Sequence, residues 1–258
     1  MWEKDGKMYH IRCAKGDIGR YVLLPGDPFR TDLIASYLDE PVLVAHNREH
    51  KTWTGTLLGE KVTVTSTGMG CPSTAIALEE LIACGADTFI RVGTAGCMCP
   101  KLRKPEASGG IVTGAIRDEG TTRQYVPLEY PAVADRQVVG ALAEAAGKLG
   151  YCFDEGITYT KDGLYPLLSP ENVPLGEERG AYMKVWEKAG VLLTEMEAAA
   201  VLVISSLRGC RASGIMAYSD AKDPTAEVDR AIKVACEAIC NLIRDDRSVV
   251  ESQESRMV

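Results

Sequence analysis

The chain has 258 residues with a net charge of −7, and 46% of its residues are hydrophobic. This size suits one domain with a substantial core, because no linker or internal repeat divides the sequence. The negative charge argues against partners such as nucleic acid or an anionic membrane. Nine cysteines, with no signal peptide or apolar stretch of membrane length, predict free thiols and a cytoplasmic location, and their spacing predicts no metal site.

Short runs rich in β-branched residues alternate with helix-like stretches, which predicts an α/β fold. The predicted strands cover residues 21–24, 61–67, 88–92, 110–115, 157–160 and 212–218. The predicted helices cover residues 72–84, 134–149 and 195–208 and a stretch that begins near 225, with Pro72 in a first turn and glycines as stops. Residues 161–180 are expected to form a long loop, either a substrate wall or a surface excursion. From 246 to 258 the chain is polar and is expected to fray.

Two segments, 24–30 and 90–96, each follow an apolar run and combine glycine with one arginine, Arg30 or Arg91. Glycines let backbone N–H groups approach a ligand, and a guanidinium grips an oxyanion with two parallel hydrogen bonds. Either segment alone also suits an ordinary turn or a solvated strand end. Together they favour a phosphate site.

Five motifs, in order, are similar to the nucleoside phosphorylase-I family, most closely its uridine phosphorylase branch. They lie at residues 22–30, 64–74, 91–96, 127–135 and 195–197. The resemblance implies one phosphorylase domain over residues 1–245, with a central mixed sheet partly closed into a barrel and flanked by helices. It implies cleavage of a nucleoside by inorganic phosphate, as co-substrate, to a free base and ribose 1-phosphate, with no cofactor.

The resemblance assigns phosphate binding to residues from two subunits. These are Gly26, Arg30, Arg91 and Thr94, with Arg48 from a neighbouring chain. Without the family, Arg48 would be interpreted as a surface arginine. The implied partner is another copy of the chain, in a hexamer built as a trimer of dimers.

The ribose is assigned to Glu197 and Met196, and to His10 across a dimer interface. A carboxylate can accept from both ribose hydroxyls and favours the positive charge that develops on the sugar. Residues 194–197 also match a capping box, in which Thr194 caps a helix and the Glu197 carboxylate accepts from the backbone N–H of Thr194. His10 alone would be an ordinary surface histidine.

The base end departs from the uridine branch. That branch holds the uracil edge with a glutamine and usually an arginine, and residues 162–170 contain neither. The resemblance leaves Gly96 and Leu164 as base contacts. Ser219 and Asp220 are similar to the purine branch, where the aspartate donates a proton at N7, although both residues also suit a turn cap.

The predicted catalytic residues are therefore Arg91, Thr94, Glu197 and Asp220. The preferred hypothesis is a uridine phosphorylase-like enzyme. The alternatives are a purine nucleoside phosphorylase that uses Asp220, a hydrolytic nucleosidase, and a nucleoside-binding or assembly protein with impaired activity. Glu49 and Ser73 match a monovalent-cation site of some family members, and this site is left open.

Overall fold

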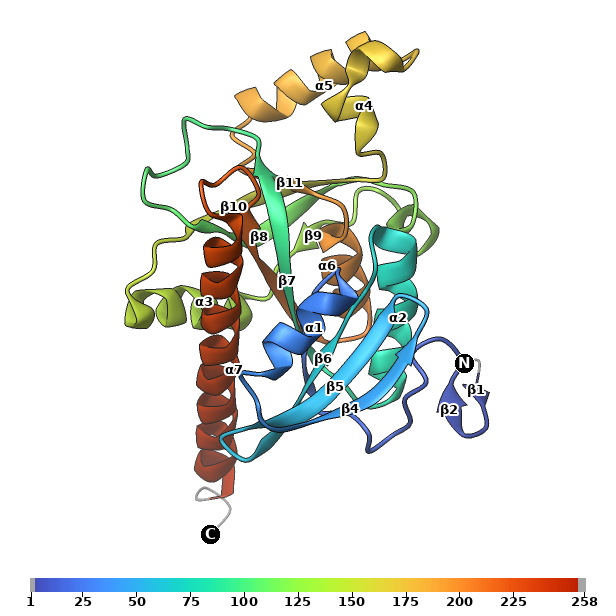
Figure 1. The fold of residues 1–258 in the computed structure, drawn as a ribbon, viewed down its shortest axis with the longest axis vertical. Coiled ribbons are helices and arrows are strands. Elements are labelled where there is room, and N and C mark those ends of the chain that lie inside the picture. The colour runs from blue at the N-terminus through green and yellow to red at the C-terminus, as the bar shows by residue number, and fades with distance from the viewer. Residues whose placement is uncertain (1–2, 255–258) are drawn as a thin grey trace.

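The computed structural model describes residues 3–254, and a ten-stranded mixed sheet lies at its centre (Figure 1). The sheet has the order β11-β10-β8-β12-β7-β3-β6-β5-β4, with β9 beside β8. All six predicted strands are present: β3 (Tyr21–Leu24), β6 (Glu60–Thr65), β7 (Thr88–Cys97), β8 (Gly109–Asp118), β10 (Asp154–Lys161) and β12 (Arg211–Tyr218). The predicted single-domain α/β fold is confirmed.

A short strand, β11 (Leu193–Glu195), closes part of this sheet into a barrel. It pairs in parallel with β10 and antiparallel with β7, so β11, β10, β8, β12 and β7 form a ring of five strands. The ring is tight where β8 meets β12, because a Cβ on Gly109 would lie 1.9 Å from the Met216 carbonyl oxygen. The partly closed barrel that the resemblance implied is therefore present.

The hairpin of β4 (Asp39–Asn47) and β5 (His50–Leu57) was not predicted. Its inward positions on β5 are polar, since Thr52 and Thr54 are buried and their hydroxyls hydrogen-bond to Thr65 and Thr63 of β6. An apolar alternation is therefore missing from the sequence. The other unpredicted strands are short: β1 (Glu3–Lys4), β2 (Lys7–Met8), β9 (Ala132–Val133) and β11.

Helices cover both faces of the sheet (Figure 1). On one face α3 (Arg136–Leu149) packs against α7 (Pro224–Glu254), and on the other α2 (Cys71–Ala83) packs against α6 (Ala198–Leu207). These four correspond to the predicted helices. The shorter α1 (Pro28–Ala35) packs against β5 and β6.

The expected loop over residues 161–180 is partly helical. It contains α4 (Tyr165–Leu168), η2 (Pro170–Asn172) and the beginning of α5 (Gly176–Lys188), which lie together at the top of Figure 1. Trp186 of α5 stacks edge-on against Tyr182 and lies 6.4 Å from the Tyr159 ring on β10. The contact of Trp186 with Tyr159 and an ion pair of Arg179 with Asp118 link α5 to the sheet, so an apolar helical periodicity could not reveal it. A further 3₁₀ turn, η1, covers Thr122–Gln124.

The tail predicted to fray from 246 is helical as far as Glu254, and residues 255–258 lie outside the described residues. Long-range polar contacts hold the helix there. The Asp246 carboxylate accepts from the Tyr21 hydroxyl at 2.6 Å and from Arg211 at 2.7 Å, and Arg247 donates to Glu60 at 2.8 Å. The polar composition of residues 246–254 is therefore compatible with a helix.

Candidate active site

A cavity of about 620 Å³ opens where several strands of the sheet end. Ligands commonly bind at such strand ends in open α/β sheets. Eight of the predicted site residues line it: Gly26, Arg30, Arg91, Thr94, Gly96, Leu164, Met196 and Glu197. The antiparallel pairing of Thr194 with Gly96 brings the residues after β11 alongside the segment of β7 that holds Arg91.

Arg91 is a buried cation of the cavity, with 5% of the residue exposed. Its Nη2 donates to the Glu197 carboxylate, and its Nε lies 3.3 Å from Glu195 Oε2. Its Nη1 has no hydrogen-bond acceptor among the described residues and faces Gly26, where an added Cβ would lie 3.9 Å away. A buried donor without an acceptor is costly, so this geometry suits a bound anion.

Arg30 adds a second positive charge beside Arg91. Burial lowers the pKa of Arg30, and the charge of Arg91 lowers it further, while Asp27 opposes both effects. Asp27 caps α1 by accepting from the Phe29 N–H at 2.9 Å, which fixes the start of the helix that carries Arg30. Two adjacent guanidinium groups repel each other, and a dianion between them would remove that repulsion.

Glu197 faces the cavity, and the capping-box interpretation of residues 194–197 is wrong. The Glu195 carboxylate, and not that of Glu197, caps α6 by accepting from the N–H groups of Glu197 at 2.7 Å and Ala198 at 2.8 Å. Glu197 Oε1 accepts from the Gly70 N–H at 2.6 Å, and Oε2 accepts from Arg91. A carboxylate has about four acceptor positions, so two remain for a ligand.

Glu195 is a residue that the sequence analysis did not assign to the site. It is buried, and it accepts from the Thr160 hydroxyl at 2.6 Å besides capping α6 and contacting Arg91. Burial raises the pKa of Glu195, and the positive charge of Arg91 opposes that rise. Glu195 thus positions both Arg91 and the start of α6. In the sequence, only its position two residues before Glu197 indicated that it could belong to the site.

The end of the cavity that is predicted to hold the base, called the base end below, is less enclosed. Leu164 is 40% exposed. Gly96 has no side chain to fill the space beside Thr194, and a Cβ added to Gly96 would lie only 3.2 Å from Thr194 Cγ2. Lys161, which the sequence analysis placed only at the start of a loop, lines the cavity here and is buried.

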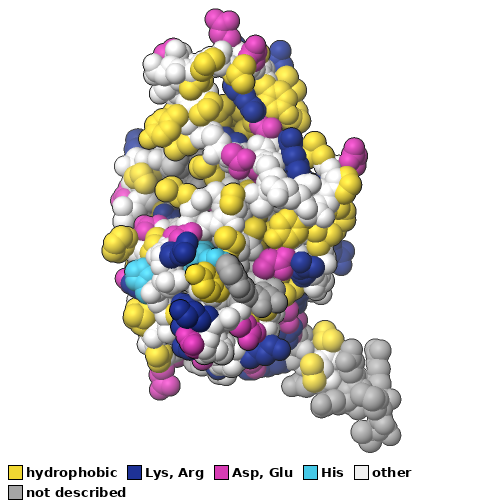
Figure 2. Space-filling view, turned by 90° about the vertical axis from the view of Figure 1, so that its right-hand side faces the viewer, with side chains coloured by type: hydrophobic (Ala, Val, Ile, Leu, Met, Phe, Trp, Pro, Cys, Tyr) yellow, Lys and Arg dark blue, Asp and Glu magenta, His cyan; other side chains and the backbone are white. Residues whose placement is uncertain are grey.

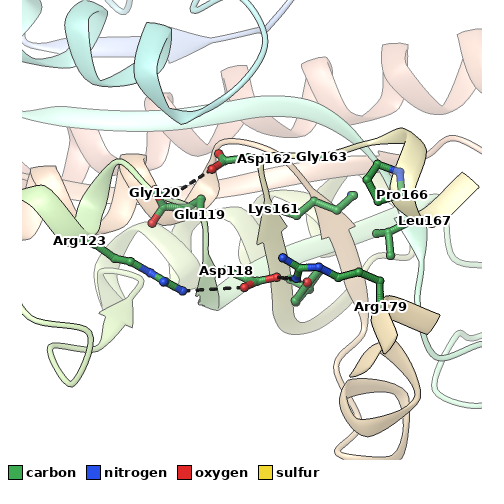
Figure 3. A pocket seen from close by; sticks show the side chains of 11 residues that line it. Asp118, Glu119, Gly120, Arg123, Lys161, Asp162, Gly163, Pro166, Leu167 and Arg179 are labelled. Carbon is green, nitrogen blue, oxygen red and sulfur yellow. Dashed lines mark hydrogen bonds and ion pairs between the residues drawn. The ribbon is translucent and has the colours of Figure 1, made fainter. Parts of the chain in front are cut away.

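A second cavity of about 290 Å³ adjoins the base end, with Lys161 lining both cavities (Figure 3). In it the Asp118 carboxylate lies 2.8 Å from Arg179 Nη1 and 3.8 Å from Arg123 Nη2. Asp118 is the last residue of β8 and Arg179 belongs to α5, so this pair links α5 to the sheet.

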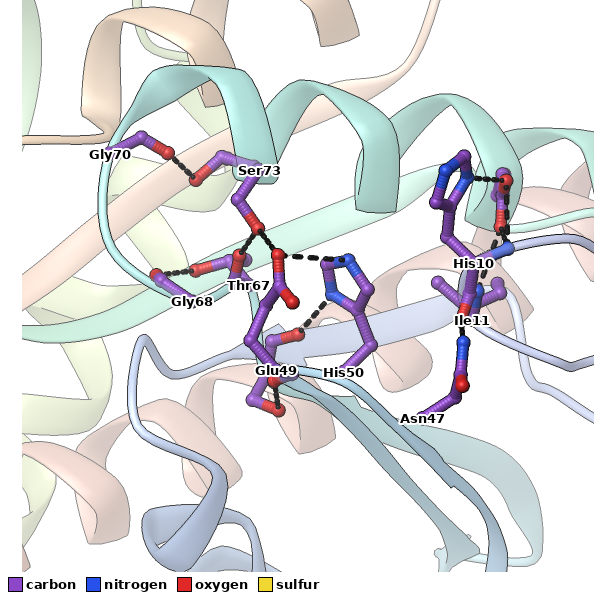
Figure 4. A network of polar contacts seen from close by, with 12 residues as sticks. His10, Ile11, Asn47, Glu49, His50, Thr67, Gly68, Gly70 and Ser73 are labelled. Atoms are coloured by element: carbon purple, nitrogen blue, oxygen red, sulfur yellow. Dashed lines mark hydrogen bonds and ion pairs between the residues drawn. The ribbon is translucent and has the colours of Figure 1, made fainter.

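Arg48, His10 and Asp220 do not line the cavity of their own chain. Arg48 is exposed in the turn between β4 and β5, with a φ of 53°. His10 Nδ1 lies 2.6 Å from Glu80 Oε1, and the N–H groups of His10 and Ile11 donate to the same carboxylate (Figure 4). The shared-site assignment of Arg48 and His10 remains a prediction.

Asp220 has an exposed side chain, 58% accessible to solvent. It pairs with Arg103 at 2.9 Å, and the Arg103 guanidinium lies 4.1 Å from the centroid of the Tyr218 ring. The neighbouring Ser219 does line the cavity.

The Glu49 and Ser73 pair forms a polar network beside the cavity (Figure 4). Ser73 Oγ lies 2.7 Å from Glu49 Oε1 and 2.5 Å from the Thr67 carbonyl oxygen. The hydrogen bond from Ser73 is the main cause that lowers the pKa of Glu49. Across residues 3–254, no group of three or more His, Cys, Asp or Glu side chains is arranged to hold a metal ion.

Comparison with known proteins now identifies the family. The sequence profile of the phosphorylase superfamily matches residues 20–245. The chain belongs to this superfamily. It is 42% identical to the uridine phosphorylase of Treponema pallidum, over 92% of this chain and 95% of that protein. It is 34% identical to the guanosine phosphorylase of Halorubrum lacusprofundi, over 92% of this chain and 99% of that protein.

The fold agrees with a solved structure of this superfamily. The crystal structure of uridine phosphorylase from Vibrio fischeri matches with a TM-score of 0.82 and 28% identity, over 93% of this chain and all of that one. The predicted membership in the nucleoside phosphorylase family is confirmed. In the described part of the chain, no helix combines the length and the apolar character needed to cross a membrane.

Proposed function

We propose that this chain cleaves uridine with inorganic phosphate, giving uracil and ribose 1-phosphate. The observation that carries the proposal is the Nη1 of Arg91, a buried donor without an acceptor among the described residues, beside the second guanidinium of Arg30. A water nucleophile would need neither arginine, so the site favours phosphorolysis over hydrolysis.

In this reaction the phosphate would lie between Arg30 and Arg91, against Gly26 and the Thr94 hydroxyl. The close backbone of Gly26 leaves room for the anion next to Arg91 Nη1. Charge-assisted hydrogen bonds would hold the dianion with one oxygen aimed at C1′ of the ribose. The residues need no cofactor for this step, because catalysis is positioning and electrostatics.

Glu197 would bind the ribose by accepting from its 2′ and 3′ hydroxyls at the two remaining acceptor positions, with Met196 against the sugar. The hydrogen bonds from Gly70 and Arg91 fix the carboxylate before substrate arrives. As the bond from C1′ to the base lengthens, the sugar gains positive charge, and a fixed anion stabilises it.

The choice of uridine over a purine is supported by the relatives and by Asp220. A carboxyl that protonates purine N7 must be neutral, whereas Asp220 is an exposed group paired with Arg103. The guanosine phosphorylase among the relatives keeps a purine substrate as the second candidate.

We further propose that the active enzyme is a homo-oligomer, with a hexamer of three dimers as the expected form, in which His10 and Arg48 complete the site of a neighbouring chain. A groove of about 410 Å³ beside His10 is lined by Pro72, Ala75, Ile76 and Tyr125 among others. Figure 2, which faces the N-terminal hairpin and α2, displays exposed hydrophobic side chains on this side. The nine free thiols support a cytoplasmic location, where the proposed cleavage would serve nucleoside salvage.

The test is release of ribose 1-phosphate from uridine, thymidine, inosine, guanosine and adenosine, each with and without phosphate. The proposal predicts phosphate-dependent release with uridine as the best substrate. Phosphate-independent release of ribose would show a nucleosidase, preference for guanosine or inosine would show the purine enzyme, and binding without turnover would show an impaired protein.

A further inference from the structure

Lys161 places a buried positive charge at the base end of the cavity. The residue is 6% exposed, and it lies at the last position of β10, next to β11. Nζ donates to the Thr194 hydroxyl at 2.7 Å. An ammonium group has three N–H donors, and this is the one hydrogen bond that Nζ makes within the described part of the chain.

The other residues at this end offer the base little charge. Leu164 is apolar, Gly96 contributes backbone only, and residues 162–170 contain no glutamine or arginine. Arg123 and Arg179 of the adjoining cavity are both engaged by Asp118. Neither arginine lines the main cavity, so among the residues that the structure describes Lys161 is the cation that lines its base end.

The charge of Lys161 fits the chemistry of a departing pyrimidine. When the C1′–N1 bond breaks, its electron pair leaves with the base, and the negative charge spreads over N1 and the two carbonyl oxygens. A phosphate oxygen forms the new bond to C1′, and the base then takes up a proton from water. A positive group at a carbonyl oxygen stabilises the charge where it develops.

We propose that Lys161 donates a hydrogen bond to a carbonyl oxygen of the pyrimidine and stabilises the leaving base as an anion. The inference rests on the proposed cleavage of uridine and names the group that makes a pyrimidine the preferred base. Lys161 stays protonated throughout, so no proton transfer to the base passes through it.

A purely structural role would have a different signature. Burial lowers the pKa of Lys161, and the negative charges of Glu195 and Glu197 nearby oppose that lowering. If Lys161 served only as their counter-ion, its removal would displace Glu197 and slow every nucleoside by the same factor. Nucleosides with different leaving bases distinguish the two roles. A base that forms a more stable anion depends less on a hydrogen bond from Lys161, so its cleavage should lose less rate when Lys161 is replaced.

The experiment compares uridine with 5-fluorouridine at saturating phosphate, in the wild type, Lys161→Met and Lys161→Arg. Fluorine withdraws electrons and stabilises the uracil anion. We expect Lys161→Met to lower kcat/KM for uridine by about 10²-fold, and for 5-fluorouridine by markedly less. Lys161→Arg should recover part of the loss. The control Lys148→Met, at an exposed lysine paired with Glu237, should change neither rate.

Equal proportional losses on the two nucleosides, or wild-type rates in Lys161→Met, would overturn the inference. Thermal unfolding with and without phosphate checks that Lys161→Met is folded and still binds phosphate. If Lys161→Met does not fold, Lys161→Gln takes its place in the comparison. A wild-type enzyme that cleaves neither pyrimidine nucleoside would instead overturn the proposed function. If the wild type cleaves uridine, the proposed function holds and the variants test the role of Lys161 alone.

Discussion

The two ends of the cavity are built differently. At the phosphate and ribose end, Arg91 and Glu197 are buried, contact each other and lie on or next to strands of the barrel. At the base end, Leu164 and the short helix α4 belong to a segment outside the sheet, and only Lys161 is both buried and charged. Under the proposed function, the edge of the sheet would carry the chemistry common to all nucleosides, and the attached segment would contact the base, which varies.

The largest loss is expected from Arg91→Ala, at the phosphate end. The variant removes the donor that faces Gly26 and leaves Glu195 and Glu197 without their shared cation. We expect kcat/KM for phosphate to fall by about 10²–10³, as for other preorganised oxyanion donors. Steady-state rates at limiting phosphate measure it, with Arg244→Ala, an exposed arginine paired with Glu237, as the control. Activity within a few-fold of wild type would remove Arg91 from the phosphate site.

Glu197→Gln tests the ribose end of the same cluster. The amide keeps the shape and can still accept from Gly70, but it loses the negative charge that opposes the developing cation. We expect kcat to fall by about 10² with any nucleoside, because the charge matters most in the transition state. Phosphate should still raise the melting temperature of the variant, since Arg30 and Arg91 remain. An effect on KM alone would show that Glu197 only binds the sugar.

Much of the phosphate and ribose end could be predicted from the sequence because its residues occur in short motifs that follow strands. Arg91 and Glu197 could be predicted as cavity residues from their local sequence patterns together with the family resemblance. Lys161 could not be predicted, because its place depends on the pairing of β10 with β11, which joins residues 33 positions apart. The local pattern also gave the wrong partner for Glu197, since a capping box and a cavity-facing carboxylate have the same spacing.

A mixing experiment tests whether Arg48 completes the site of a neighbouring chain. Arg48→Ala and Arg91→Ala should each be poorly active alone. In a dimer with shared sites, one mixed site carries both lesions and the other carries none, so random mixing should restore about a quarter of the wild-type sites. The assay is phosphorolysis after the two variants are unfolded and refolded together. No gain over the separate proteins would show that each chain uses its own Arg48 or none.

The smallest effect is expected from Asp220→Asn, and it decides how far the base end resembles the purine branch. Asp220 is exposed and paired with Arg103, an arrangement worth about 0–1 kcal/mol. The substitution should therefore lower the melting temperature slightly and change the rates for uridine and inosine by the same small factor. A protonated aspartate at N7 would instead make the loss specific to inosine, by about one to three decades, because a proton donor at the leaving base acts mainly in the transition state. A selective loss on inosine would mean that the Arg103 pair opens when a purine binds, and the comparison of the two ends would then have to include Asp220 among the groups that act on the base.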